Sequence, residues 1–84
     1  MDIATFDKEV KAALGTLPEE PIKLVKAVVS ATKNFTENYF VDITWYDGLN
    51  EATTQLKMER DLSPEAIKEQ IKTAYDCAAI QYLL

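Results

Sequence analysis

The stretch that most constrains the fold is YFVDITWYDGLNEATTQLKM, residues 39–58, in which side-chain character alternates on both sides of an Asp-Gly pair. The alternating sets are Tyr39, Val41, Ile43 and Trp45 against Phe40, Asp42, Thr44 and Tyr46, then Ala52, Thr54, Leu56 and Met58 against Glu51, Thr53, Gln55, Lys57 and Glu59. A period of two is typical of strands with one buried face, because successive side chains point to opposite sides. The sequence therefore predicts a β-hairpin with strands at about 39–46 and 49–58.

The Asp-Gly pair also predicts how the two strands align. Asp47 and Gly48 suit a two-residue type I′ turn, because both tolerate the positive φ that this turn requires. Tyr46 would then pair with Leu49, and Tyr39 with Leu56. This alignment puts the apolar sets of both strands on one face, whereas a one-residue slip would separate them.

A helical interpretation of the same stretch remains open, because several of its apolar residues also recur at steps of three and four. Asp42, Thr44, Gly48 and other poor helix formers argue against it in the first half. The second half has better helix propensity. The alternative fold is therefore an all-α bundle in which residues 49–60 form a helix.

The segments on either side predict amphipathic helices. The first runs from Asp2 or Ile3 to Leu14 and ends near Gly15, a residue suited to a left-handed C-terminal cap. A capping box at Thr16 starts a second helix that extends to about Asn38. Its apolar stripe consists of Ile22, Val25, Val28, Val29, Thr32 and Phe35.

The last helix begins after Ser63, a favourable N-cap that is followed by Pro64. Its expected buried residues are Ile67, Ile71, Ala74, Tyr75, Ala78 and Tyr82. The expected fold class is α+β, with two N-terminal helices, a β-hairpin and a C-terminal helix.

The length and the net charge of the chain limit the classes of function that it can have. The chain has 84 residues and a net charge of −5, which predicts one small domain over residues 1–84 and argues against direct nucleic-acid binding. No apolar run has membrane-spanning length and no signal peptide is seen. The single cysteine, Cys77, cannot form an internal disulfide and is expected to be buried. We expect a cytoplasmic protein that does not bind membranes.

The residues available for chemistry favour a non-enzymatic protein. The sequence has no histidine and only two glycines, which removes the commonest general base and metal ligand and excludes glycine-rich phosphate loops. Asp42 and Glu51 could share one strand face, but charges on a solvated sheet explain them without catalysis. We expect no catalytic residues, no metal and no cofactor.

Exposed aromatic residues on the hairpin suggest a binding surface for another protein, possibly one with a basic surface. The candidate partner-binding residues are Phe40, Trp45, Tyr46, Asp42 and Glu51. The protein would act as an inhibitor, adaptor or accessory subunit. In a sharper version, its carboxylates mimic nucleic acid in a basic groove, although lysines interleave with the acidic residues.

The C-terminal end predicts self-association, because a helix that is apolar nearly all round should be buried. The candidate oligomerisation residues are Ile80, Tyr82, Leu83 and Leu84. The alternative is that this end folds back under the hairpin.

A second hypothesis is an oligomeric protein that binds a small, nucleotide-like anion. Lys23, Lys26 and Lys33 would share one side of the second predicted helix, and an aromatic side chain could supply a stacking surface. A solvated lysine face explains the same three residues without a ligand.

Overall fold

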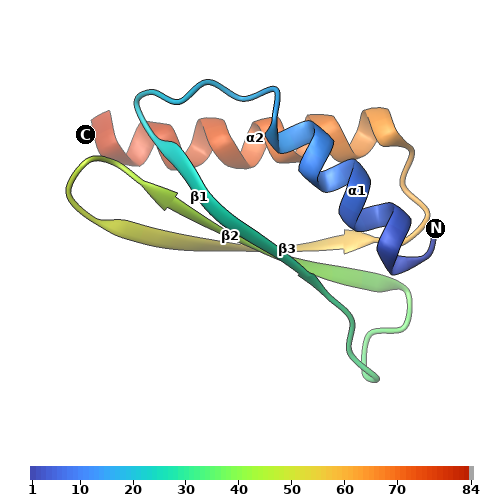
Figure 1. Cartoon of the computed structure of the whole chain (residues 1–84). Helices are drawn as coiled ribbons and strands as arrows, with labels where there is room; N and C mark the ends of the chain where they lie inside the picture. The colour runs from blue at the N-terminus through green and yellow to red at the C-terminus, as the bar shows by residue number, and fades with distance from the viewer. Residues whose placement is uncertain (84) are drawn as a thin grey trace.

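The chain folds as helix, three strands and helix, as the computed structural model shows (Figure 1). The elements are α1 (Ile3–Leu14), β1 (Lys23–Ser30), β2 (Asn38–Tyr46), β3 (Glu51–Glu59) and α2 (Pro64–Leu83). The structure describes residues 1–83, and for residues 82 and 83 it describes the backbone only. The strands form an antiparallel sheet in the order β1-β2-β3. The α+β class is confirmed, whereas the all-α alternative is wrong.

Both helices pack on the same face of the sheet. The Phe6 ring of α1 lies 4.8 Å from the Tyr39 ring of β2, and the Tyr75 ring of α2 lies 5.7 Å from the Trp45 ring. Tyr39 and Trp45 are six positions apart along β2, so their side chains lie on the same face of the strand. We call this covered side the inner face and the opposite side the outer face.

The hairpin of β2 and β3 confirms the alternation seen in the sequence. The inner-face residues of β2 are buried: Tyr39, Val41, Ile43 and Trp45. Together with Ala27 of β1 and Met58 of β3 they form the sheet's part of one hydrophobic core, to which α1 and α2 contribute residues such as Val10 and Ile71. A central strand packed between two others explains why β2 supplies the most deeply buried side chains.

The predicted turn is wrong, and the register differs from the expected one by two residues. Tyr46 pairs with Glu51 and Tyr39 with Met58, so the connection consists of residues 47–50. The Asp47 carboxylate accepts hydrogen bonds from the backbone N–H groups of Leu49 at 2.8 Å and Asn50 at 2.7 Å, and Gly48 has φ +100°. This side-chain capping favours a four-residue loop over a two-residue turn. A shift of two residues leaves every side chain on its predicted face.

The second N-terminal helix is wrong, because residues 23–30 form strand β1 at the edge of the sheet. The register of β1 against β2 shifts between Leu24 and Lys26, so Val25 is the extra residue of a β-bulge. Inward residues Leu24 and Ala27 are therefore three positions apart. The bulge breaks the period of two and leaves apolar residues at helix-like steps.

The two helices have the expected starts. Asp2 caps α1 by accepting a hydrogen bond from the Thr5 N–H at 2.8 Å, and Ser63 caps α2 by accepting one from the Ala66 N–H at 3.2 Å. Gly15 has φ −66°, so the expected left-handed cap at the end of α1 is wrong.

One long-range hydrogen bond connects α2 to the segment before β1. The Tyr75 hydroxyl donates to the Glu20 carbonyl at 2.7 Å.

The loop between β2 and β3 should make the hairpin sensitive to acid. Its two backbone N–H donors hold the pKa of the Asp47 carboxyl below its usual range. A depressed pKa in the folded state means that the ionised carboxylate stabilises the fold at neutral pH, and that this contribution is lost as the pH falls below about 4. Asp47→Ala should therefore unfold at lower urea concentration than the unmodified chain near pH 7. The gap between the two midpoints should narrow as the pH falls below about 4, and a gap that stays constant would contradict this role.

Candidate protein-interaction surface

The outer face of the sheet carries exposed apolar side chains from β1, β2 and the loop between them. The exposed fractions are 51% for Val28, 45% for Phe35 and 40% for Tyr46, and Phe40 is half-buried. We call these four residues the outer patch. Neither helix packs on this side, so the outer patch lacks the cover that the inner face receives from α1 and α2.

Aromatic contacts hold part of the outer patch in place. The Phe35 and Phe40 rings meet edge to face with centroids 5.5 Å apart. The Lys57 ammonium of β3 lies 5.2 Å from the centroid of the Phe35 ring, within reach of a cation–π interaction. The loop after β1 thus folds its aromatic side chain back against the sheet and leaves part of the ring exposed.

Two outer-patch residues, Val28 and Phe35, were expected in the buried stripe of a helix and are instead exposed. The error follows from the bulge in β1, since a strand interpretation would have placed Val28 opposite Asp42 on the outer face. Phe35 lies beyond the strand in the connecting loop. The predicted helix placed Phe35 in its apolar stripe, and no other feature of the sequence indicated that Phe35 is exposed.

The structure separates the three aromatic candidates of the hairpin. Phe40 and Tyr46 lie on the outer face, whereas Trp45 is 1% exposed on the inner face. The indole Nε1 of Trp45 donates to the Thr54 hydroxyl at 3.1 Å, so its polar atom is satisfied inside the protein. Trp45 is therefore a core residue and does not present its ring to a partner, in contrast to the expectation.

The two candidate carboxylates, Asp42 and Glu51, are also on the outer face. Asp42 accepts a hydrogen bond from the Gln55 amide at 3.0 Å, and Glu51 lies exposed at the start of β3, opposite Tyr46. Within residues 1–83, no group of three or more acidic, cysteine or histidine side chains is placed to hold a metal ion. Asp42 lies inside the outer patch, directly opposite Val28 on the central strand, and Glu51 lies at its edge.

The candidate anion-binding lysines are not on a shared helix face. Lys23 begins β1 and Lys33 lies in the loop beyond its end, so the two are separated by the full strand of 8 residues, about 25 Å in extended conformation. Lys26 is on β1 and pairs with Thr44. The helix that would have brought these lysines together does not exist.

The last helix packs within its own chain, at least as far as Ala79. Ile67, Ile71 and Tyr75 are buried against the sheet and α1, and Ala78 and Ala79 remain 7% and 8% exposed. Ile80 is 56% exposed. The side chains of the other candidate oligomerisation residues, Tyr82, Leu83 and Leu84, lie outside the described part of the structure.

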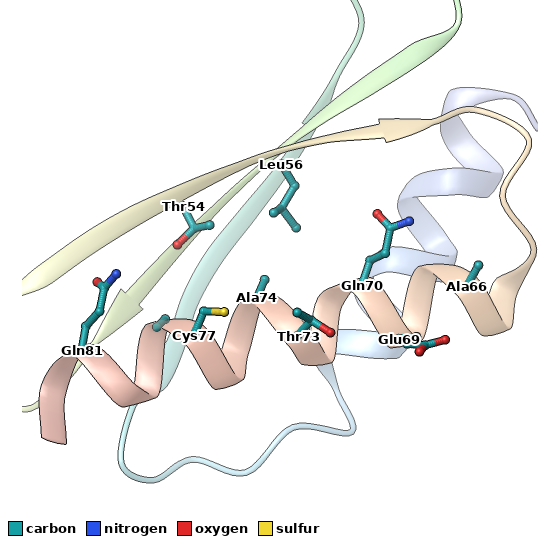
Figure 2. Close-up of a pocket in the computed structure, with 10 residues that line it drawn as sticks. Thr54, Leu56, Ala66, Glu69, Gln70, Thr73, Ala74, Cys77 and Gln81 are labelled. Atoms are coloured by element: carbon teal, nitrogen blue, oxygen red, sulfur yellow. The ribbon is translucent and has the colours of Figure 1, made fainter.

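A groove of about 600 Å³ runs between α2 and β3. Figure 2 shows Thr54 and Leu56 pointing from β3 towards α2, with Gln70 and Gln81 extending from the helix towards the strand. Cys77 lines the groove and is exposed, so the expectation of a buried thiol is wrong. It lies on the flank of α2 that faces the groove.

Comparison with protein-family models, with curated proteins and with solved structures finds no match to this chain. Among the helices that the structure describes, none combines the length and apolarity needed to cross a lipid bilayer.

Proposed function

We propose that this chain is a non-enzymatic interaction module that binds another protein through the outer face of its sheet. The observation that carries the proposal is the outer patch, in which Val28, Phe35 and Tyr46 remain 51%, 45% and 40% exposed although the chain has two helices available to cover the sheet. Both helices pack on the inner face. Exposed apolar and aromatic side chains gathered on one face are typical of protein-binding surfaces.

The arrangement suits a binding surface, because its central aromatic residues are partly ordered before a partner arrives. Phe35 is held against Phe40, and its position on the sheet limits the side-chain entropy that binding would remove. Tyr46 offers both an apolar ring and a hydroxyl, which donates to the Gly48 carbonyl at 2.9 Å. Aromatic residues of this kind supply much of the binding energy in protein interfaces.

We propose a partner with an apolar contact area bordered by basic groups. Asp42 lies within the outer patch opposite Val28, Glu51 lies opposite Tyr46, and the whole chain carries a net charge of −5. Opposite charges at the rim of an interface accelerate association and are screened by salt. Binding should therefore weaken with salt, while the apolar contacts retain part of the affinity.

Affinity purification with the tagged full chain tests this proposal. We expect one protein to co-purify in stoichiometric amount with the unmodified chain, and its recovery to fall at least about tenfold with Val28→Ser or Phe35→Ser. Both substitutions remove exposed apolar area and leave the core intact. Recovery should also decrease when the same purification is run at high salt.

Leu49→Ser is the matched control, because Leu49 is 86% exposed but lies in the loop between β2 and β3, outside the outer patch. This variant should capture the partner as well as the unmodified chain does. Urea unfolding of each variant checks that the fold is retained. Equal capture by the control and both outer-patch variants, or no stoichiometric partner at all, would reject the outer face as the binding surface.

A further inference from the structure

The outer edge of β3 is an open strand edge. In residues 1–83, β3 pairs only with β2, through a register without interruption from Glu51 to Glu59. The backbone N–H and C=O groups on its other side are thus free to pair with another strand. The opposite edge of the sheet differs, because β1 carries a bulge and two lysines, Lys23 and Lys26, which are common protections against strand addition.

The inner face beneath this open edge is also incompletely covered. Leu56 is half-buried and lines the groove between β3 and α2, and Ala52 is exposed although it lies on the inner face. Figure 2 shows that the groove separates the strand from the helix along this side of the molecule. A strand added to β3 would place its own inner-face side chains over this opening.

We propose that the occupant of this edge is a second copy of the same chain, with the two β3 strands antiparallel about a two-fold axis at Thr54. The argument is charge complementarity within the strand itself. With the axis at Thr54, Glu51 of each copy lies opposite Lys57 of the other, so the two-fold symmetry generates this pair twice. On the inner face, Ala52 of each copy lies opposite Leu56 of the other. Opposite charges and apolar pairs directly across an antiparallel ladder both stabilise it.

Neighbouring registers lack this match. An axis at Gln55 puts Glu51 opposite Glu59 of the other copy, and like charges directly across a ladder are destabilising. An axis at Thr53 puts Lys57 opposite Leu49, a residue of the loop. Slips by a single residue would place inner-face side chains opposite outer-face ones, which breaks the alternation. The charges on β3 therefore favour the axis at Thr54 over both neighbouring registers.

The exposed side of α2 is compatible with the same two-fold arrangement. Thr73, Cys77 and Ile80 follow one another at steps of four and three residues, so they share one face of the helix. Thr73 and Cys77 line the groove, and Ile80 is 56% exposed. Small side chains at Thr73 and Cys77 allow a second helix to approach closely, and Ile80 adds apolar area to the contact. The resulting dimer has a continuous six-stranded sheet, since each copy contributes three strands.

Sedimentation velocity over a concentration series tests the proposal on the full chain. The unmodified chain should dimerise, and Glu51→Lys and Lys57→Glu should each raise the dissociation constant at least about tenfold. These two substitutions change the net charge in opposite directions, so an effect of overall charge would move the constant in opposite directions. The double variant E51K/K57E should recover dimerisation, because it exchanges the partners of both ion pairs.

Lys26→Glu is the matched control, since it reverses a lysine on the outer face at the protected β1 edge. It should leave the dissociation constant unchanged. A monomer at every concentration, single variants that dimerise normally, or a double variant that fails to recover would each overturn the proposal.

Disulfide trapping tests the register independently. Thr54→Cys in a Cys77→Ser background should form a disulfide-linked dimer on mild oxidation, because residue 54 of each copy lies directly opposite its equivalent. Ala52→Cys in the same background should not, because equivalent residues four positions apart in register are separated by roughly 13 Å. Efficient trapping at residue 52 instead of 54 would refute this register. Glu51 belongs to both proposed surfaces and Lys57 contacts Phe35 of the outer patch, so the charge variants affect both. Trapping at residue 54 tests the dimer alone and Val28→Ser tests the partner surface alone, so either proposal can fail while the other stands.

Discussion

Replacing Trp45 with alanine is expected to lower the free energy of unfolding by about 3–5 kcal/mol, the usual cost of truncating a large buried aromatic residue. Trp45 is 1% exposed, packs edge to face on Tyr75 of α2 and donates its indole N–H to Thr54. A stability of about 4–12 kcal/mol is typical of a chain this long. The loss therefore removes between about a quarter and all of the stability, and urea titration followed by circular dichroism should show a correspondingly lower midpoint.

Tyr46→Ala is the control for this prediction, because Tyr46 is the next residue along the same strand but lies on the outer face, 40% exposed. Its removal deletes an exposed hydrogen bond to Gly48, and we expect a loss of about 1 kcal/mol or less. Equal destabilisation by the two substitutions would contradict the assignment of the two faces. A stable Trp45→Ala variant that loses partner binding would instead favour the surface role expected from the sequence.

Replacing Ile71 with alanine is expected to destabilise the chain by about 2–5 kcal/mol. Ile71 is fully buried where α2 packs on the core formed by the sheet and α1. This packing is within one chain, so the loss should be the same at low and high protein concentration. Urea midpoints measured across a dilution series would test both the size of the loss and its independence of concentration.

Ile80→Ala is the matched substitution on the same helix, at a residue that is 56% exposed. We expect a change within about 0.5 kcal/mol in the stability of the monomer. If Ile71→Ala were harmless in dilute monomer, α2 would not be docked within its own chain. If Ile80→Ala were as damaging as Ile71→Ala, Ile80 would belong to the core.

The three surfaces of the sheet have different chemical roles in this protein. The inner face is closed by α1 and α2 and supplies stability through residues such as Ile43 and Trp45. The outer face and the β3 edge remain open. The outer face carries aromatic and apolar side chains, whereas the β3 residues on that face are charged or polar. The two proposed contacts therefore differ in chemistry, although both include Glu51.

The sequence alone determined the parts of this fold that depend on local chemistry. The period of two in residues 39–58 specified both strands and the face of every side chain, because adjacent residues in a strand must point in opposite directions. Ser63 marked the start of α2, because its side chain satisfies a backbone N–H group that the first helical turn leaves free. The placement of Phe40 and Tyr46 opposite Tyr39 followed from the same alternation.

Only the tertiary structure decided the features that depend on contacts between distant residues. Residues 23–30 became a strand because β2 offers an edge for them to pair with, and the bulge at Val25 hid this from the local pattern. The Asp47 carboxylate lengthened the hairpin loop and moved the register by two residues. The packing of α2 against the sheet and α1 buried Ile71 and left Cys77 and Ile80 exposed. The spacing of residues in the sequence shows which side chains share a face of a helix or strand. Which other element packs on that face depends on the tertiary structure.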